Sequence, residues 1–242
     1  MNKQTFGRGV VALVLVILGM IAATMTVFAD NPTILPPNSK PFGKTYGEWS
    51  VEHWKWIYSL PVDHHPLFDT ADCSAGQSGK VWFLGGMFSV TNPSPGVFIG
   101  NTTRNCKVPV GKALFFPIVD VEGSTVEGNG VTEAELRAFA NFVADHAANL
   151  FAEIDGKPIT NLNAYRAQSP LFTFGPLPAN NALGLPQGTT SPAVSDGYFL
   201  MIAPLSSGRH TIHFKGSIIL GQPTDPGYFE FSLDITYNIT VK

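Results

Sequence analysis

Apolar positions recur with helical spacing early in the chain. Over residues 45–60, apolar and aromatic side chains crowd most of a helical wheel. The polar positions form only a narrow arc: Glu48, Glu52, Lys55 and Ser59. Thr45 with Glu48 three residues later is a capping box, and Pro61 ends the pattern. The pattern therefore predicts a mostly buried helix over residues 45–60.

A second helical pattern covers residues 132–152. Thr132 and Glu135 again form a capping box, and the apolar positions share one face of the wheel. The opposite ridge is polar: Arg137, Asn141, Asp145 and Asn149. Asp155-Gly156, which follows, is a two-residue hairpin signal.

The remaining apolar segments have the pattern of strands. Residues 208–219 and 228–241 alternate apolar and polar side chains, which is typical of antiparallel strands with one buried face. Residues 80–90 and 105–122 contain continuous apolar runs, and Pro117 in the second run predicts a strand edge or a bulge. We expect residues 91–100 to form a loop. The fold class predicted is mainly β (α+β), an antiparallel β-sandwich or jelly-roll-like domain with two packed helices.

The first 29 residues have the layout of a secretory signal peptide. Lys3 and Arg8 precede an uncharged apolar run of about 18 residues, and Val27-Phe28-Ala29 offers a cleavage site. An uncleaved membrane anchor is the alternative, and it is the only membrane contact we expect. We therefore predict a secreted or cell-surface protein, with a proline-rich extended lead-in over residues 30–44 and one β-rich domain over residues 45–242.

Composition and charge narrow the function classes. Only 14% of the residues are charged and the formal net charge is −3, with no basic patch, which argues against nucleic acid as a partner. Neither a phosphate-binding loop nor a dinucleotide fingerprint is visible, so we expect no cofactor. Asn101 and Asn238 begin N-glycosylation sequons.

Cys73 and Cys106 are the two cysteines of the chain. An even pair in an exported protein predicts a disulfide, which would close a loop of about 33 residues and contribute roughly 3–4 kcal/mol.

Histidines and aspartates around the first helix form a candidate pocket. His53 shares an aromatic face of the helical wheel with Trp49 and Trp56, and His64, His65 and Asp69 follow in an irregular stretch. Histidine and carboxylate are suitable ligands for zinc. The histidine spacing matches no metal motif, however, so a core histidine and a solvated loop are the simpler interpretation, and we predict no metal.

Asp120 and Glu122 follow a buried strand with a two-residue period. Paired carboxylates at one rim would suit acid–base or glycosidic chemistry. The simpler expectation is a solvated strand end.

The segments GQSGKVWFLGG (76–86) and CKVPVGKALFFPIVDVE (106–122) resemble a group of exported prokaryotic proteins. The shared features span most of the mature chain and include the aromatic helix and both cysteines. No activity is established for that group, so the resemblance implies export and a single domain and assigns no catalytic residue.

These observations predict a β-rich domain with a binding or structural role. Its ligand would be a carbohydrate or another envelope component held on exposed aromatic side chains. The alternative is an extracellular hydrolase or metal-dependent enzyme with a pocket built from His53, His64, His65 and Asp69.

Overall fold

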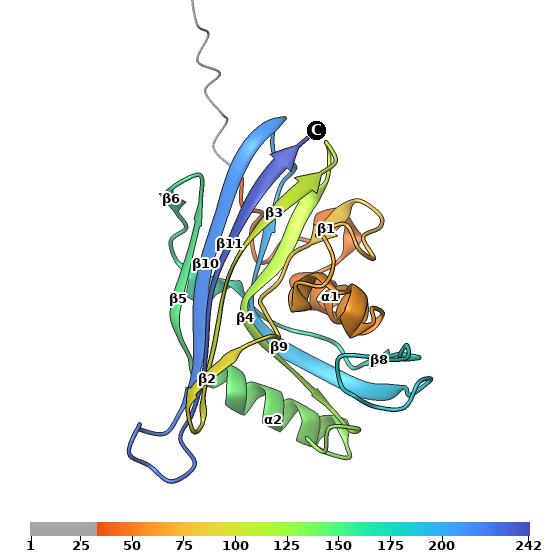
Figure 1. Ribbon diagram of the computed structural model, residues 1–242, viewed down its shortest axis with the longest axis vertical. Helices are drawn as coiled ribbons and strands as arrows, with labels where there is room; N and C mark the ends of the chain where they lie inside the picture. The colour runs from red at the N-terminus through yellow and green to blue at the C-terminus, as the bar shows by residue number, and fades with distance from the viewer. Residues whose placement is uncertain (1–32) are drawn as a thin grey trace, which may run out of the picture.

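Two β-sheets packed face to face form the body of the protein, with one helix on the outer face of the first sheet and a second helix at its end (Figure 1). The computed structural model describes residues 33–242. The expected signal peptide and the start of the lead-in lie outside the described residues. Within the described part of the chain, no helix is long and apolar enough to span a membrane.

The first sheet has five strands. Its main path is β1 (Val81–Phe83), β4 (Ala113–Ser124), β9 (Ser191–Ile202) and β7 (Arg166–Gln168), and β8 (Phe172–Phe174) also pairs with β9. The second sheet has six strands, in the order β2 (Thr91–Ser94), β3 (Val97–Val108), β11 (Phe229–Val241), β10 (Gly208–Leu220), β5 (Ala147–Ile154) and β6 (Lys157–Pro158).

The predicted alternation in the last third of the chain is confirmed. β10 and β11 pair antiparallel along their whole length, from Gly208 opposite Val241 to Leu220 opposite Phe229. Both sheets are nevertheless mixed, because β1 pairs parallel with β4 and β11 pairs parallel with β3. The β-sandwich class is therefore correct, although its strands are not all antiparallel.

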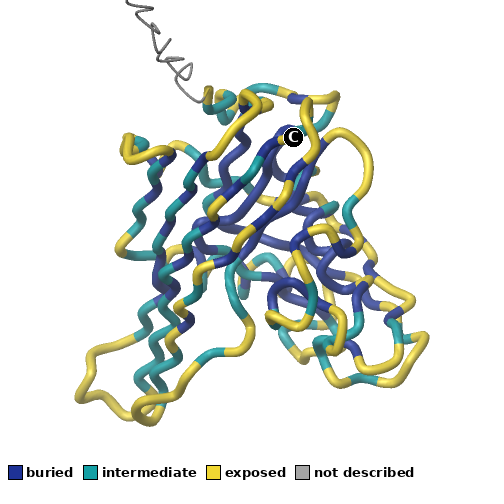
Figure 2. The backbone as a smooth tube through the Cα atoms, turned by 45° about the horizontal axis from the view of Figure 1, so that its top comes forward, coloured by how far each residue is buried: buried dark blue, intermediate teal, exposed yellow. Residues whose placement is uncertain are grey.

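The inner faces of the two sheets bury the larger core. Side chains from both sheets interdigitate there, among them Phe116, Phe214 and Tyr237. Figure 2 shows that buried residues gather in the central strands and that exposed residues gather in the connecting loops. Transfer of this apolar surface out of water is the main stabilising contribution to the sandwich.

Helix α1 (Tyr46–Tyr58) covers the other face of the first sheet. Both hydrogen bonds of the predicted capping box between Thr45 and Glu48 are present. The apolar side chains of α1 form a second core with Phe115, Phe199 and Phe174. Three of the four short 3₁₀ helices flank α1 and the fourth precedes β7: η1 (Pro41–Gly43), η2 (Val62–His64), η3 (Pro66–Phe68) and η4 (Leu162–Tyr165).

Helix α2 (Glu133–Asp145) is shorter than predicted. Its capping box at Thr132 is confirmed, but the expected helix over residues 146–152 is wrong. His146 caps the helix, and Ala147–Ile154 form β5, which pairs with β10. Ladder hydrogen bonds to β10 therefore override the helical spacing. The Asp155-Gly156 hairpin is confirmed, with both residues at positive φ between β5 and β6.

Two strand boundaries also differ from expectation. The apolar run 80–90 is strand only over Val81–Phe83, and the rest forms a loop. The expected loop over residues 91–100 instead contains β2 and the start of β3. Pairing with β11 begins β3 at Val97, within the expected loop.

The lead-in follows the first sheet. Ile34 forms a bridge with Ile202, and the Leu35 amide donates to the Met201 carbonyl oxygen at 2.8 Å. The Tyr46 hydroxyl on α1 donates to the Leu35 carbonyl oxygen at 2.7 Å. These bonds join the lead-in to both the sheet and the helix.

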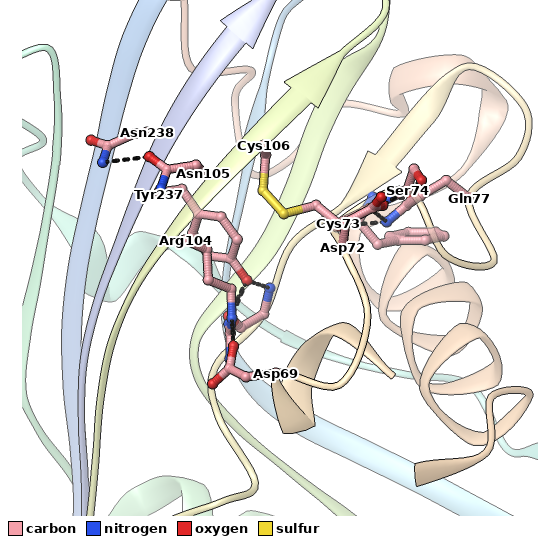
Figure 3. Close-up of a disulfide and its surroundings, with 12 residues drawn as sticks. Asp69, Asp72, Cys73, Ser74, Gln77, Arg104, Asn105, Cys106, Tyr237 and Asn238 are labelled. Atoms are coloured by element: carbon pink, nitrogen blue, oxygen red, sulfur yellow. Dashed lines mark hydrogen bonds and ion pairs between the residues drawn. A yellow bond between two sulfur atoms is a disulfide. The ribbon is translucent and has the colours of Figure 1, made fainter. Parts of the chain in front are cut away.

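Cys73 and Cys106 form the predicted disulfide, with Cα atoms 5.6 Å apart (Figure 3). The bond ties the irregular segment after α1 to β3. It therefore connects the segment after α1 covalently to the second sheet.

We expect the double variant Cys73→Ser/Cys106→Ser to lose about 3–4 kcal/mol of unfolding free energy, because the unfolded chain gains the freedom of an open loop. Urea unfolding under oxidising and reducing conditions measures this loss. Reduction should destabilise the natural protein by a similar amount and leave the double variant unchanged. Equal stability of the natural protein and the double variant under oxidising conditions would contradict the expectation.

Candidate functional site

The residues of the histidine pocket predicted from the sequence do not form one pocket, because they lie on α1 and around η2 and η3. His53 is buried on α1, and its Nε2 donates to the Leu84 carbonyl oxygen at 2.8 Å. Burial, with a smaller effect from nearby His65, lowers the pKa of His53 to about 4, against the opposing effect of the Leu84 carbonyl. His53 is therefore neutral near pH 7, and its Nδ1 is a buried acceptor without a partner.

The other predicted pocket residues lie around η2 and η3. His65 is buried, its Nε2 donates to the Ile57 carbonyl oxygen at 3.0 Å, and its Nδ1 accepts from the Leu67 amide at 3.0 Å. Both ring nitrogens of His65 thus form hydrogen bonds with backbone groups. His64 is exposed, and Asp69 is an exposed partner of Arg104. Within residues 33–242, no group of three or more histidine, cysteine or acidic side chains is arranged to hold a metal ion.

Trp49 and Trp56 differ in exposure. Trp56 is buried, and its ring centroid lies 5.5 Å from that of His53 and 6.2 Å from that of His65. Trp49 is half-buried, and its indole N–H donates to the Pro41 carbonyl oxygen at 2.8 Å. The two predicted histidines share Trp56 as a neighbour, but their nitrogens bind separate backbone groups.

A β-bulge in β4 determines where the carboxylates after Pro117 point. Pro117 pairs with Phe199 and Val119 with Tyr198, so Ile118 is the extra residue. Leu114, Phe116 and Ile118 face the core between the sheets. Without the bulge, Asp120 and Glu122 would continue that row into the apolar core. With it, they face α1.

The expected solvated strand end is therefore wrong. Glu122 is buried, and Asp120 has a fully covered Oδ2 atom. Gly197 on β9 lies opposite Asp120, and a Cβ at Gly197 would lie 2.4 Å from the Asp120 Cβ. A glycine is thus required for the strands to approach each other at this carboxylate.

Glu122 is held in the protonated form. The Tyr58 hydroxyl donates to its Oε2 at 2.8 Å. Burial raises the pKa of Glu122 to about 10, and the neighbouring carboxylate of Glu127 adds to the rise. A neutral Glu122 avoids a buried negative charge beside the exposed carboxylate of Glu127.

Asp120 has fewer hydrogen-bond partners than Glu122. Burial raises its pKa to about 7, and its Oδ2 has no hydrogen-bond partner. The Trp54 indole nitrogen opposes the rise in pKa, although no hydrogen bond of normal geometry joins the two side chains. Asp120 is therefore divided between its two protonation states near pH 7.

Asp120, Trp54 and His53 line one cavity of about 70 Å³ between α1, β4 and the loop after β1. Each of the three side chains has a buried polar atom without a hydrogen-bond partner: His53 Nδ1, Trp54 Nε1 and Asp120 Oδ2. The rest of the wall is mostly apolar and includes Leu67, Met87, Phe88, Phe231 and Leu233. An apolar pocket with a few converging polar groups is the usual form of a small-ligand site.

Arg104 holds the loop that closes this cavity (Figure 3). Its Nη1 donates to the Gly86 carbonyl oxygen at 2.7 Å and to the Tyr237 hydroxyl at 2.8 Å, and its Nε pairs with Asp69 at 2.6 Å. The Tyr237 hydroxyl in turn donates to the Gly85 carbonyl oxygen at 2.8 Å. These bonds fix the cavity loop to the second sheet next to the disulfide.

Three residues at or beside the cavity were not assigned to it from the sequence. Trp54 sits at the flank of the helical wheel, Arg104 lies in a polar strand segment, and Asp120 has the pattern of a strand end. The signal available for Asp120 was Pro117, which predicts a bulge and hence a change of face in a buried strand. Nothing in the local sequence places Arg104 beside the cavity loop.

Comparisons with known proteins give little guidance. No protein-family model matches the chain, and no curated protein matches it. Among solved structures, the chain is similar to one described as "Structure of PbICP-C in complex with falcipain-2", with 15% sequence identity and a TM-score of 0.23. The match covers 68% of this chain and 100% of that chain. A likeness this distant carries no argument about function.

Replacing Glu122 by glutamine should change the pH dependence of stability. The folded-state pKa of about 10 lies above the ordinary value of 4.5, so the folded protein holds this proton more tightly than the unfolded chain. The stability associated with Glu122 is complete below about pH 4.5 and is lost as pH rises toward 10. The natural protein should therefore lose unfolding free energy relative to Glu122→Gln as pH rises from 5 to 8. The difference between the two proteins should grow by up to about 1.4 kcal/mol per pH unit.

Urea unfolding at several pH values measures this difference. Asp63→Asn, at an exposed aspartate, is the matched control and should follow the natural protein. A constant difference between Glu122→Gln and the natural protein across this pH range would show that Glu122 titrates normally.

Proposed function

We propose that the protein is an exported or cell-surface β-rich domain that binds a small ligand in the cavity between α1 and β4. One observation carries the proposal. Within residues 33–242, six buried side-chain polar atoms have no hydrogen-bond partner, and three of them belong to residues that line this cavity. Buried polar groups are normally satisfied, so this concentration supports a missing partner, either water or a ligand.

The size of the cavity supports a small guest. Its 70 Å³ is about half the volume of an engineered apolar cavity of roughly 150 Å³ that binds benzene. We infer that one end of the ligand enters the cavity and that the rest lies toward its mouth, near exposed Phe88.

The same geometry favours binding over catalysis. His53 is neutral near pH 7 and its Nε2 is bound to the Leu84 carbonyl oxygen, so that nitrogen does not reach a substrate. Asp120 and Glu122 lie beneath α1, which leaves no open cleft between them for a sugar chain. The hydrolase or metal-dependent alternative therefore has less support than a binding role.

Export is part of the proposal. The N-terminal segment has the layout of a signal peptide, and the Cys73–Cys106 disulfide is typical of proteins outside the reducing cytosol. The resemblance of residues 76–86 and 106–122 to exported prokaryotic proteins supports the same location.

The structure gives less support to a carbohydrate held on exposed aromatic side chains. Among the described residues, the exposed aromatic side chains are Phe42, Phe88 and Phe142. Trp54, Trp56 and Trp82 are buried. We therefore favour a ligand with a small apolar part over an extended sugar surface.

1-Butanol is a suitable neutral probe of this site. We expect it to bind with millimolar affinity and to shift the NMR signal of the Trp54 indole N–H, which lines the cavity. The Trp49 and Trp56 indoles are internal controls, because both donate to carbonyl oxygens outside the cavity wall. Trp54→Phe assigns the signal. An unchanged Trp54 signal at saturating probe would contradict the proposal.

A further inference from the structure

We infer that the cavity binds an organic ammonium group, with the carboxylate of Asp120 as its counter-ion. This inference rests on the proposed binding function and names the chemical class of the ligand. A primary amine with a short apolar chain fits the site best, because the cavity combines an unpaired acid with an apolar and aromatic wall.

The hydrogen-bonding groups of the cavity are mostly acceptors. His53 Nε2 carries the hydrogen that it donates to the Leu84 carbonyl oxygen, so His53 Nδ1 is an acceptor. Asp120, when ionised, has only acceptor sites. The Trp54 N–H is the one donor among the three unpartnered atoms, and it lies near Asp120. A ligand that completes this set must donate hydrogen bonds, and an ammonium group has three donors and no acceptor.

The described part of the chain supplies no cation to Asp120. Its lysine and arginine ion pairs go to other acids, including Asp69, Asp196 and Asp234. Arg104, the buried arginine nearest the cavity loop, donates to Asp69, Tyr237 and the loop carbonyl groups; its Nη2 has no partner, but Arg104 is not among the residues that line the cavity. A buried carboxylate without a counter-ion is costly, so it either takes up a proton or binds a cation from outside.

The titratable neighbours of Asp120 are uncharged near neutral pH. From α1 these are His53, with a pKa lowered to about 4, and Tyr58, whose pKa burial raises. From β4 the neighbour is Glu122, with a pKa raised to about 10. The cavity loop and β11 contribute only side chains that do not titrate: Met87, Phe88, Phe231 and Leu233. Asp120 is thus the cavity residue whose protonation state changes between pH 6 and 8.

The walls also suit the uncharged part of an amine. Trp54, Phe88 and Phe231 line the cavity, and aromatic faces attract ammonium groups. Leu67, Met87 and Leu233 provide contact for a short alkyl chain. An anionic ligand would instead face Asp120 without a compensating donor other than Trp54.

Three four-carbon probes test the inference: n-butylamine, 1-butanol and butyrate. At pH 8 we expect butylamine to bind at least tenfold more tightly than 1-butanol, and butyrate to bind more weakly than both. Asp120→Asn keeps the shape of the side chain and should remove the preference for the amine, so that the ratio of the two affinities falls from at least tenfold to about one. Asp63→Asn is the control and should keep the preference. The readout is the Trp54 indole shift.

Proton release provides an independent measurement on the natural protein. At pH 6.5, binding of butylamine to protonated Asp120 should release a proton, so the calorimetric enthalpy should vary with the ionisation enthalpy of the buffer. Affinity for butylamine should fall between pH 8 and pH 6, by up to about tenfold per unit below the pKa.

The outcomes separate the two proposals. Equal binding of butylamine and 1-butanol at the Trp54 indole, without proton release, would overturn the ammonium assignment and leave the binding function standing. Failure of all three probes to affect Trp54 would overturn both.

Discussion

The close packing of α1 on the first sheet is the constraint on which the rest of the structure depends. Gly47 faces the backbone of β7, where a Cβ would lie 2.0 Å from the Gln168 carbonyl oxygen. The hydroxyl groups of Ser50 on α1 and Ser195 on β9 lie 2.8 Å apart in the same buried layer. Small side chains therefore bring the helix onto the strands. Any polar group that β4 or β9 presents to this face is removed from water.

The bulge at Ile118 places two carboxylates in this layer. Glu122 is accommodated by protonation and by the Tyr58 hydroxyl. Asp120 lacks such a partner and lies instead at the wall of a cavity. Burial of unpartnered polar groups is costly, and such groups are concentrated at functional sites. The cavity is enclosed by a loop that Arg104 and Tyr237 bind, so elements from both sheets determine its shape.

Much of the fold could be predicted from the sequence because its signals are local. Capping boxes at Thr45 and Thr132, the Asp155-Gly156 turn and the alternation in β10 and β11 each depend on neighbouring residues. The failures arose where pairing between distant strands decides the structure. Residues 147–152 have helical spacing but pair with β10, and β3 begins early because β11 lies beside it.

The candidate site was harder to predict for the same reason. His53 was identified from its aromatic neighbours, but the role of Asp120 depends on a bulge that turns it toward α1. Arg104 reaches the cavity loop only because the second sheet folds over the first. Residue type identified the acids and histidines, whereas burial and unmet hydrogen bonds distinguished those at a cavity from those bound to the backbone.

The titration of Asp120 distinguishes a buried, unpaired carboxylate from a solvated one. Carboxyl ¹³C NMR from pH 4 to 9, with Asp120→Asn to assign the signal, measures the midpoint without any ligand. We expect a midpoint near 7, raised from the ordinary value of 3.8 because the carboxylate is buried without a counter-ion. A midpoint near 3.8 would show a solvated or paired carboxylate and would contradict the cavity as a binding site.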